Sequence, residues 1–61
     1  MRREDAKRRI LRALRSGPLY EGALALVVGQ GWAFDRALQE LRREGAVERS
    51  PDNPMTWRLR Q

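Results

Sequence analysis

Four side chains between positions 32 and 43 recur at helical spacing and have the chemistry to contact nucleic acid. They are Trp32, Arg36, Gln39 and Arg43. Guanidinium groups pair with phosphates or guanine edges, a carboxamide pairs with adenine, and an indole stacks on flat groups. Residues three or four apart share one side of a helix, so the set predicts a nucleic-acid contact surface. The alternative is a solvated helix face on which Arg36 and Arg43 form i, i+4 pairs with Glu40 and with Gln39 or neighbouring acidic residues.

The same segment carries an apolar stripe that would fix those four side chains against a core. Its members follow the i, i+3, i+4, i+7 pattern of an amphipathic helix and are Phe34, Ala37, Leu38 and Leu41. Gly45 follows the last periodic residue, where helices commonly end in the left-handed region. The pattern predicts a helix that ends at Gly45 and points its polar side away from the core.

Two helices are expected before this one. Residues 3–16 form an amphipathic pattern that Gly17-Pro18 should end, and Leu19-Tyr20 follows as a brief extended piece. Residues 21–28 are apolar enough for a short helix or a buried strand, and alanine and leucine favour the helix. Gly29-Gln30-Gly31 predicts a tight turn into the third helix.

The C-terminal part predicts a β-hairpin. Residues 46–50 and 55–60 bracket Pro51-Asp52-Asn53-Pro54, four turn formers. In the second flank Met55, Trp57 and Leu59 alternate with polar residues, so these three should face the core. The polar side chains that the hairpin offers to nucleic acid are Arg49, Ser50, Asn53, Thr56 and Arg58. The alternative is a solvated edge that charge protects from pairing with other strands.

This order of elements predicts one α+β domain over residues 1–61. Two helices joined by a glycine turn, the second with a polar outer side, fit a helix-turn-helix, and the hairpin fits a wing over a three-helix core. The expected fold is therefore a small winged helix, with a three-helix core and a C-terminal β-hairpin wing.

The chain resembles the winged helix-turn-helix superfamily along nearly its whole length. Ala25 and Gly29, the segment 38–47 (LQELRREGAV) and Trp57-Arg58-Leu59 carry the resemblance. A weaker resemblance, to the Z-alpha type of Z-DNA- and Z-RNA-binding domain, rests on Pro54-Met55-Thr56-Trp57.

Asp35 and Gln39 stand where the Z-alpha type has an asparagine and a stacking tyrosine. The superfamily resemblance implies DNA binding, often as a homodimer, although some members bind only proteins.

Positive charge is concentrated at the N-terminus. The chain has thirteen basic and eight acidic residues, a net charge of +5, and all its basic residues but Lys7 are arginines. Residues 1–16 hold seven basic and two acidic groups, whereas residues 17–61 hold six of each. Arg8, Arg9 and Arg12 lie on the outer side of the first helix. They are expected to reach flanking phosphates, to hold a different acidic partner (RNA or protein), or to remain a solvated face.

Composition argues against several classes of function. The chain has no cysteine or histidine, so disulfides, zinc fingers and the usual nucleophile–base pairs are not expected. We expect no catalysis, no metal and no cofactor. No apolar run approaches the roughly 18 residues of a membrane span, which predicts a soluble cytoplasmic or nucleoid-associated protein.

The residues together favour a duplex-DNA-binding winged helix, acting as a small transcriptional regulator or accessory factor. The alternative is a winged helix that docks on a larger protein complex without touching nucleic acid. Trp32 would then be an interface anchor.

Overall fold

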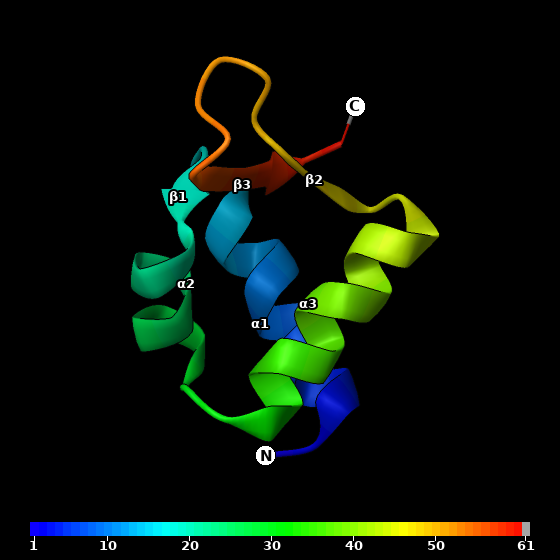
Figure 1. Cartoon of the computed structure of the whole chain (residues 1–61). Helices are drawn as coiled ribbons and strands as arrows, with labels where there is room; N and C mark the ends of the chain where they lie inside the picture. The colour runs from blue at the N-terminus through cyan, green and yellow to red at the C-terminus, as the bar shows by residue number, and fades with distance from the viewer. Residues whose placement is uncertain (61) are drawn as a thin grey trace.

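The computed structural model describes residues 1–60 and contains three helices and one small sheet (Figure 1). In chain order the elements are α1 (Arg3–Leu14), β1 (Leu19–Tyr20), α2 (Glu21–Val28), α3 (Trp32–Glu44), β2 (Val47–Arg49) and β3 (Thr56–Leu59). The expected α+β class is confirmed, with a three-helix core and a C-terminal β-hairpin.

Helix α1 is the central element of the core. It packs against both α2 and α3, and its buried side consists of Ala6, Ile10 and Leu14. The helix ends at Leu14, two residues earlier than predicted. The reason is a tightened last turn, in which the Arg15 N–H bonds to the Arg12 carbonyl and the Gly17 N–H to the Leu14 carbonyl.

The turn between α2 and α3 requires the two glycines that predicted it. Gly29 has φ of 116° and Gly31 has φ of 134°, values that side-chain-bearing residues rarely adopt. Beyond the turn, the whole predicted stripe of α3 is buried (Phe34, Ala37, Leu38 and Leu41), and the left-handed Gly45 ends the helix as expected. The outward direction of α3 is therefore set by its core contacts.

The sheet has the strand order β1-β3-β2, and both pairings are antiparallel. Leu19 lies opposite Trp57, and Val47 lies opposite Leu59. The short extended piece at 19–20 is thus a third strand, which pairs with the predicted hairpin. Trp57 is buried, as the alternating pattern predicted, with 3% of its surface exposed.

The prediction that Met55 faces the core is wrong. Met55 is 67% exposed and its N–H bonds to the Asn53 side-chain oxygen at 3.1 Å, so it belongs to a tight turn before the strand. Thr56 is buried instead. Its hydroxyl lies 2.7 Å from the Ser50 hydroxyl and 2.9 Å from the Asn53 carbonyl oxygen. Ser50 and Thr56 therefore stabilise the turn and are not offered to a ligand.

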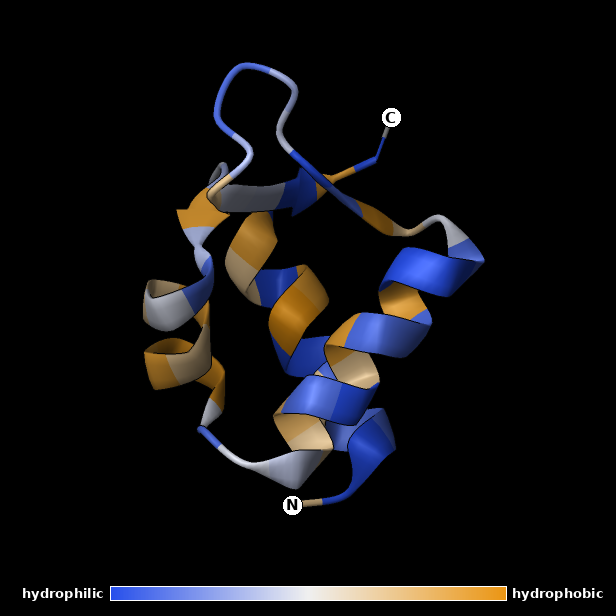
Figure 2. Cartoon of the chain, in the orientation of Figure 1, coloured by the Kyte–Doolittle hydropathy of each residue, from blue (hydrophilic) through white to orange (hydrophobic). Residues whose placement is uncertain are grey.

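Helix α2 differs from the other two helices in carrying almost no polar residues. Figure 2 shows it largely without hydrophilic residues after Glu21. Leu24, Ala25 and Val28 face the core, but Leu26 and Val27 are exposed. Within residues 1–60, no helix is long and apolar enough to cross a membrane.

Candidate nucleic-acid interface

The outward side of α3 brings together the four residues that the helical spacing had grouped. Trp32, Arg36, Gln39 and Arg43 are all exposed. The guanidinium carbon of Arg36 lies 5.0 Å from the centroid of the Trp32 ring, within the range of a cation–π contact. Trp32 is 70% exposed, so it neither folds back over the core nor shields Arg36 from solvent. The guanidinium and the ring therefore lie together on the outward side of α3.

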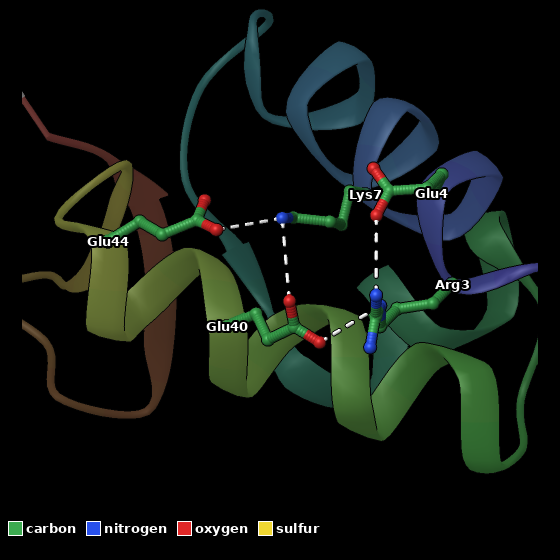
Figure 3. Close-up of polar contacts among 5 residues, drawn as sticks. All are labelled: Arg3, Glu4, Lys7, Glu40 and Glu44. Atoms are coloured by element: carbon green, nitrogen blue, oxygen red, sulfur yellow. Dashed lines mark hydrogen bonds and ion pairs between the residues drawn. The ribbon is translucent and has the colours of Figure 1, made fainter.

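The acidic residues of α3 are engaged with α1. Figure 3 shows Arg3 between Glu4 and Glu40, and Lys7 between Glu40 and Glu44. Lys7 Nζ lies 2.8 Å from a Glu44 carboxylate oxygen and 3.6 Å from one of Glu40, while Arg3 Nε lies 3.0 Å from Glu40. We call this cluster (Arg3, Lys7, Glu40 and Glu44) the α1–α3 clasp.

Because of the clasp, Glu40 does not pair with Arg36, which was the alternative predicted for Arg36. Glu40 pairs across to α1, and within residues 1–60 neither Arg36 nor Arg43 forms a salt bridge. The outward side of α3 therefore keeps two guanidinium groups whose charge no neighbouring carboxylate offsets by direct contact. Asp35 is exposed on the same helix and is the remaining acidic group there.

The acidic residues around Lys7 raise its pKa. The hydrogen bond to Glu44 raises the pKa of Lys7 above its ordinary 10.5 and partial removal from water opposes this, while the charges of Glu44, Glu4 and Glu40 raise it further. Lys7 is therefore fully charged at neutral pH, as the clasp requires.

Arg49 holds the β2–β3 hairpin to the rest of the fold. Its guanidinium carbon lies 4.5 Å from the centroid of the Trp57 ring, and its N–H donates to the Pro54 carbonyl at 3.0 Å. Glu21 of α2 lies 3.8 Å from Arg49 and accepts a hydrogen bond from the Trp57 indole N–H at 2.9 Å. Arg49, predicted as a nucleic-acid contact, is thus occupied by structural contacts.

Arg58 and Asn53, the remaining exposed or partly exposed hairpin residues that were predicted as contacts, also have partners within the fold. Arg58 Nε donates to Glu48 on the neighbouring strand at 2.7 Å. The Asn53 amide lies 3.4 Å from the Tyr20 hydroxyl, and Asn53 shapes the turn described above. These contacts fix the form of the hairpin and leave less of each side chain for a ligand.

Sequence reasoning missed Arg42. Its guanidinium carbon lies 5.8 Å from the centroid of the Trp57 ring, so it links the last turn of α3 to the hairpin while remaining exposed. It was overlooked because, at 100° per residue, it lies off the line of Arg36 and Arg43. The pairing of Arg3 and Lys7 with Glu40 and Glu44 was also missed, although both pairs are four residues apart, a spacing that signals matching helix faces.

The predicted basic flank lies on a different side of the molecule. Arg8, Arg9 and Arg12 are exposed on the side of α1 that faces away from α2 and α3, and α1 lies behind those helices in Figure 1. Arg8 is paired with Asp5. The fold therefore does not bring these arginines next to the outward side of α3.

No protein-family model, curated protein or solved structure matched this chain.

Proposed function

We propose that this protein is a winged helix-turn-helix domain that binds duplex DNA through α3, as a small transcriptional regulator or accessory factor. One observation carries the proposal. Glu40 and Glu44 are turned toward Arg3 and Lys7 of α1, and the outward side of α3 is left with exposed arginines that have no carboxylate partner within residues 1–60. In this family of geometries the second helix of the pair enters the major groove.

The residues of α3 have distinct roles in this proposal. Arg36 and Arg43, about two turns apart, pair with phosphates or with guanine edges, and Gln39 between them addresses adenine. Trp32 supports the Arg36 guanidinium from behind. A fixed guanidinium loses less rotamer freedom on binding, which favours affinity.

The hairpin contributes as a preformed shape. Arg49, packed on Trp57 and bonded to Pro54, holds the turn at 50–55 in position. Arg42 and Arg58 flank this region and are partly available to the DNA backbone. The wing thus orients the duplex, while α3 distinguishes its sequence.

The experiment is duplex binding by gel shift at about 50 mM salt, where phosphate contacts are strong. R36A/R43A is expected to bind at least about tenfold more weakly than the wild type, the loss that follows from removing two charge-assisted contacts. R12A/R15A is the matched control, since it removes the same charge from exposed positions on α1. The affinity of R12A/R15A for the first duplex should stay within about threefold of the wild-type affinity, because charge away from the interface acts only at long range. Wild-type affinity in a folded R36A/R43A would refute the proposal.

A second candidate, docking on a protein partner, is favoured by the apolar surface of α2. Leu26 and Val27 are 75% and 65% exposed, although solvent-facing helix positions are usually polar. With Trp32 they would supply the anchors of a protein interface. The same gel shift separates the two: no shift with duplex, single strand or RNA would favour docking. Sedimentation of L26S/V27S against the wild type tests whether this surface forms a homodimer.

A further inference from the structure

We propose that α1 carries a second nucleic-acid site on the far side of the molecule, so that one chain bridges two duplex segments. This rests on the proposed function, because α3 is taken as the first site. The ligand of the second site is the phosphate backbone of a separate duplex. The site consists of Arg8, Arg9, Arg12 and Arg15.

The arginines of α1 form a ridge along one side of the helix. Arg8, Arg12 and Arg15 follow i, i+4 and i+7 spacing, and Arg9 borders them. At about 1.5 Å of rise per residue the ridge is about 10 Å long. Duplex DNA carries one charge per roughly 1.7 Å of axis when both strands are counted, so a segment of this length carries about six phosphates, of which one side faces the ridge.

The ridge is positively charged after neighbouring acids are counted. Asp5 pairs with Arg8. Glu4, one helical turn before Arg8, contacts Arg3 at 3.6 Å, so these two acidic residues leave a net excess of positive charge among the four ridge arginines. Arg9, Arg12 and Arg15 form no salt bridge within residues 1–60. The clasp with α3 uses Arg3 and Lys7, which are different residues of the same helix. The fold thus divides the basic groups of α1 between an inner structural set and an outer set that remains available.

The two surfaces cannot contact the same straight duplex. The buried side of α1 is packed against α2 and α3, and the arginine ridge is on the reverse side. The outward side of α3 lies opposite its buried stripe, and at its edge toward α1 it borders Arg3, which is not part of the ridge. Two packed helices, with axes about 8–10 Å apart, therefore separate the two surfaces. A chain that binds one duplex by α3 presents the ridge to another.

The two sites differ in composition. The α3 side combines an amide and an indole with its arginines, a set that can distinguish bases, whereas the ridge consists of guanidinium groups around the partly buried Leu11. Contacts to phosphate alone carry no sequence information and weaken steeply with salt. The second site is therefore sequence-independent and weaker than the first.

A two-duplex capture assay tests the bridge. One duplex is immobilised on beads, the protein is bound at about 50 mM salt, and a second, labelled duplex is added after washing. The wild type should retain the labelled duplex on the beads. The amount retained should be greatest at an intermediate protein concentration, because at excess protein each duplex is covered by separate protein molecules and no molecule bridges the two. R9Q/R12Q/R15Q should still bind the beads through α3, within about threefold of the wild type, and should retain less than about a tenth as much label, since each lost phosphate contact weakens the second site. Circular dichroism verifies that this variant is folded.

The outcomes distinguish the two proposals. Equal capture by the folded triple variant, or bead binding by the wild type without capture, overturns the bridge and leaves the α3 proposal standing. Equal capture by the variant is also the result expected if a homodimer bridges through two copies of α3. If R36A/R43A binds the beads as the wild type does, the α3 proposal fails. If the bead-bound protein captures a labelled acidic protein through the ridge but does not capture the labelled duplex, the bridge between two duplexes is likewise overturned.

Discussion

Helices α1 and α3 are both amphipathic and both carry arginines on their exposed sides, yet the fold uses them differently. On α3, Glu40 and Glu44 pair with Arg3 and Lys7 of α1. The outward side of α3 is therefore a polar surface that consists of Arg36, Gln39 and Arg43. On α1 the inner basic residues serve the clasp, and the outer ones form an almost purely cationic ridge. Residues of the same type thus either pair with a neighbouring helix or remain exposed to solvent, according to their direction from the core.

The largest expected effect comes from weakening the core packing between α1 and α3. Ile10 is fully buried on α1, and I10A should cost about 2–5 kcal/mol of unfolding free energy. A domain of this size rarely has more than about 3–5 kcal/mol in total, so much of the variant should be unfolded. Thermal unfolding followed by circular dichroism measures the loss. L26A, at a position 75% exposed, is the control and should change the midpoint little. A wild-type midpoint for I10A would mean that the helices do not depend on this contact.

A smaller effect should separate recognition from attraction. Q39A on α3 should lose about 1–3 kcal/mol of preference at a single base pair, the value of one bidentate amide contact, while its salt dependence stays unchanged. R12A on α1 should have the opposite effect in the capture assay. The slope of log binding constant against log salt concentration should flatten by about 0.9, while the sequence preference stays unchanged. Selection from a randomised duplex pool and a salt titration measure the two quantities. A changed slope for Q39A would show that the surfaces are not divided in this way.

The smallest effect concerns the clasp and appears only at high pH. The folded state raises the pKa of Lys7 above its ordinary 10.5 through the Glu44 hydrogen bond, so the stabilisation is fully present below about 10.5. It is lost as the pH rises through the higher folded pKa. K7R remains charged throughout this range. Urea unfolding at pH 9 and above should therefore show the wild type losing stability relative to K7R, and parallel curves would contradict a role for the Lys7 charge.

The helices and their buried sides were predictable because each depends on local periodicity. The stripe from Phe34 to Leu41 and the turn glycines Gly29 and Gly31 were identified correctly, since side-chain spacing and permitted φ values act within a few residues. The hairpin was also predicted, but its first core residue was not. Met55 was misplaced because an Asn53 side-chain contact delays the strand by one residue. An alternating pattern cannot reveal such a contact.

The candidate site was predictable in its members on α3 and less so in its surroundings. Spacing alone grouped Trp32, Arg36, Gln39 and Arg43, and all four are exposed on one helix. The sequence did not show that Arg49 packs on Trp57, or that Arg42 approaches the same ring from α3. These contacts join residues 8 and 15 positions apart on different elements, so they depend on how the hairpin folds back over the helix.

By itself, the sequence determined the order of the elements, the side that each helix buries and the concentration of positive charge at the N-terminus, because hydrophobic periodicity and composition are local properties. Only the tertiary structure decided which charges meet. Glu40 had a partner of suitable spacing in Arg36, yet packing of α1 against α3 placed Arg3 and Lys7 closer to it. The same packing turned the two exposed arginine surfaces in opposite directions. Electrostatic partnership is set by distance in space, and that distance exists only once the core has formed.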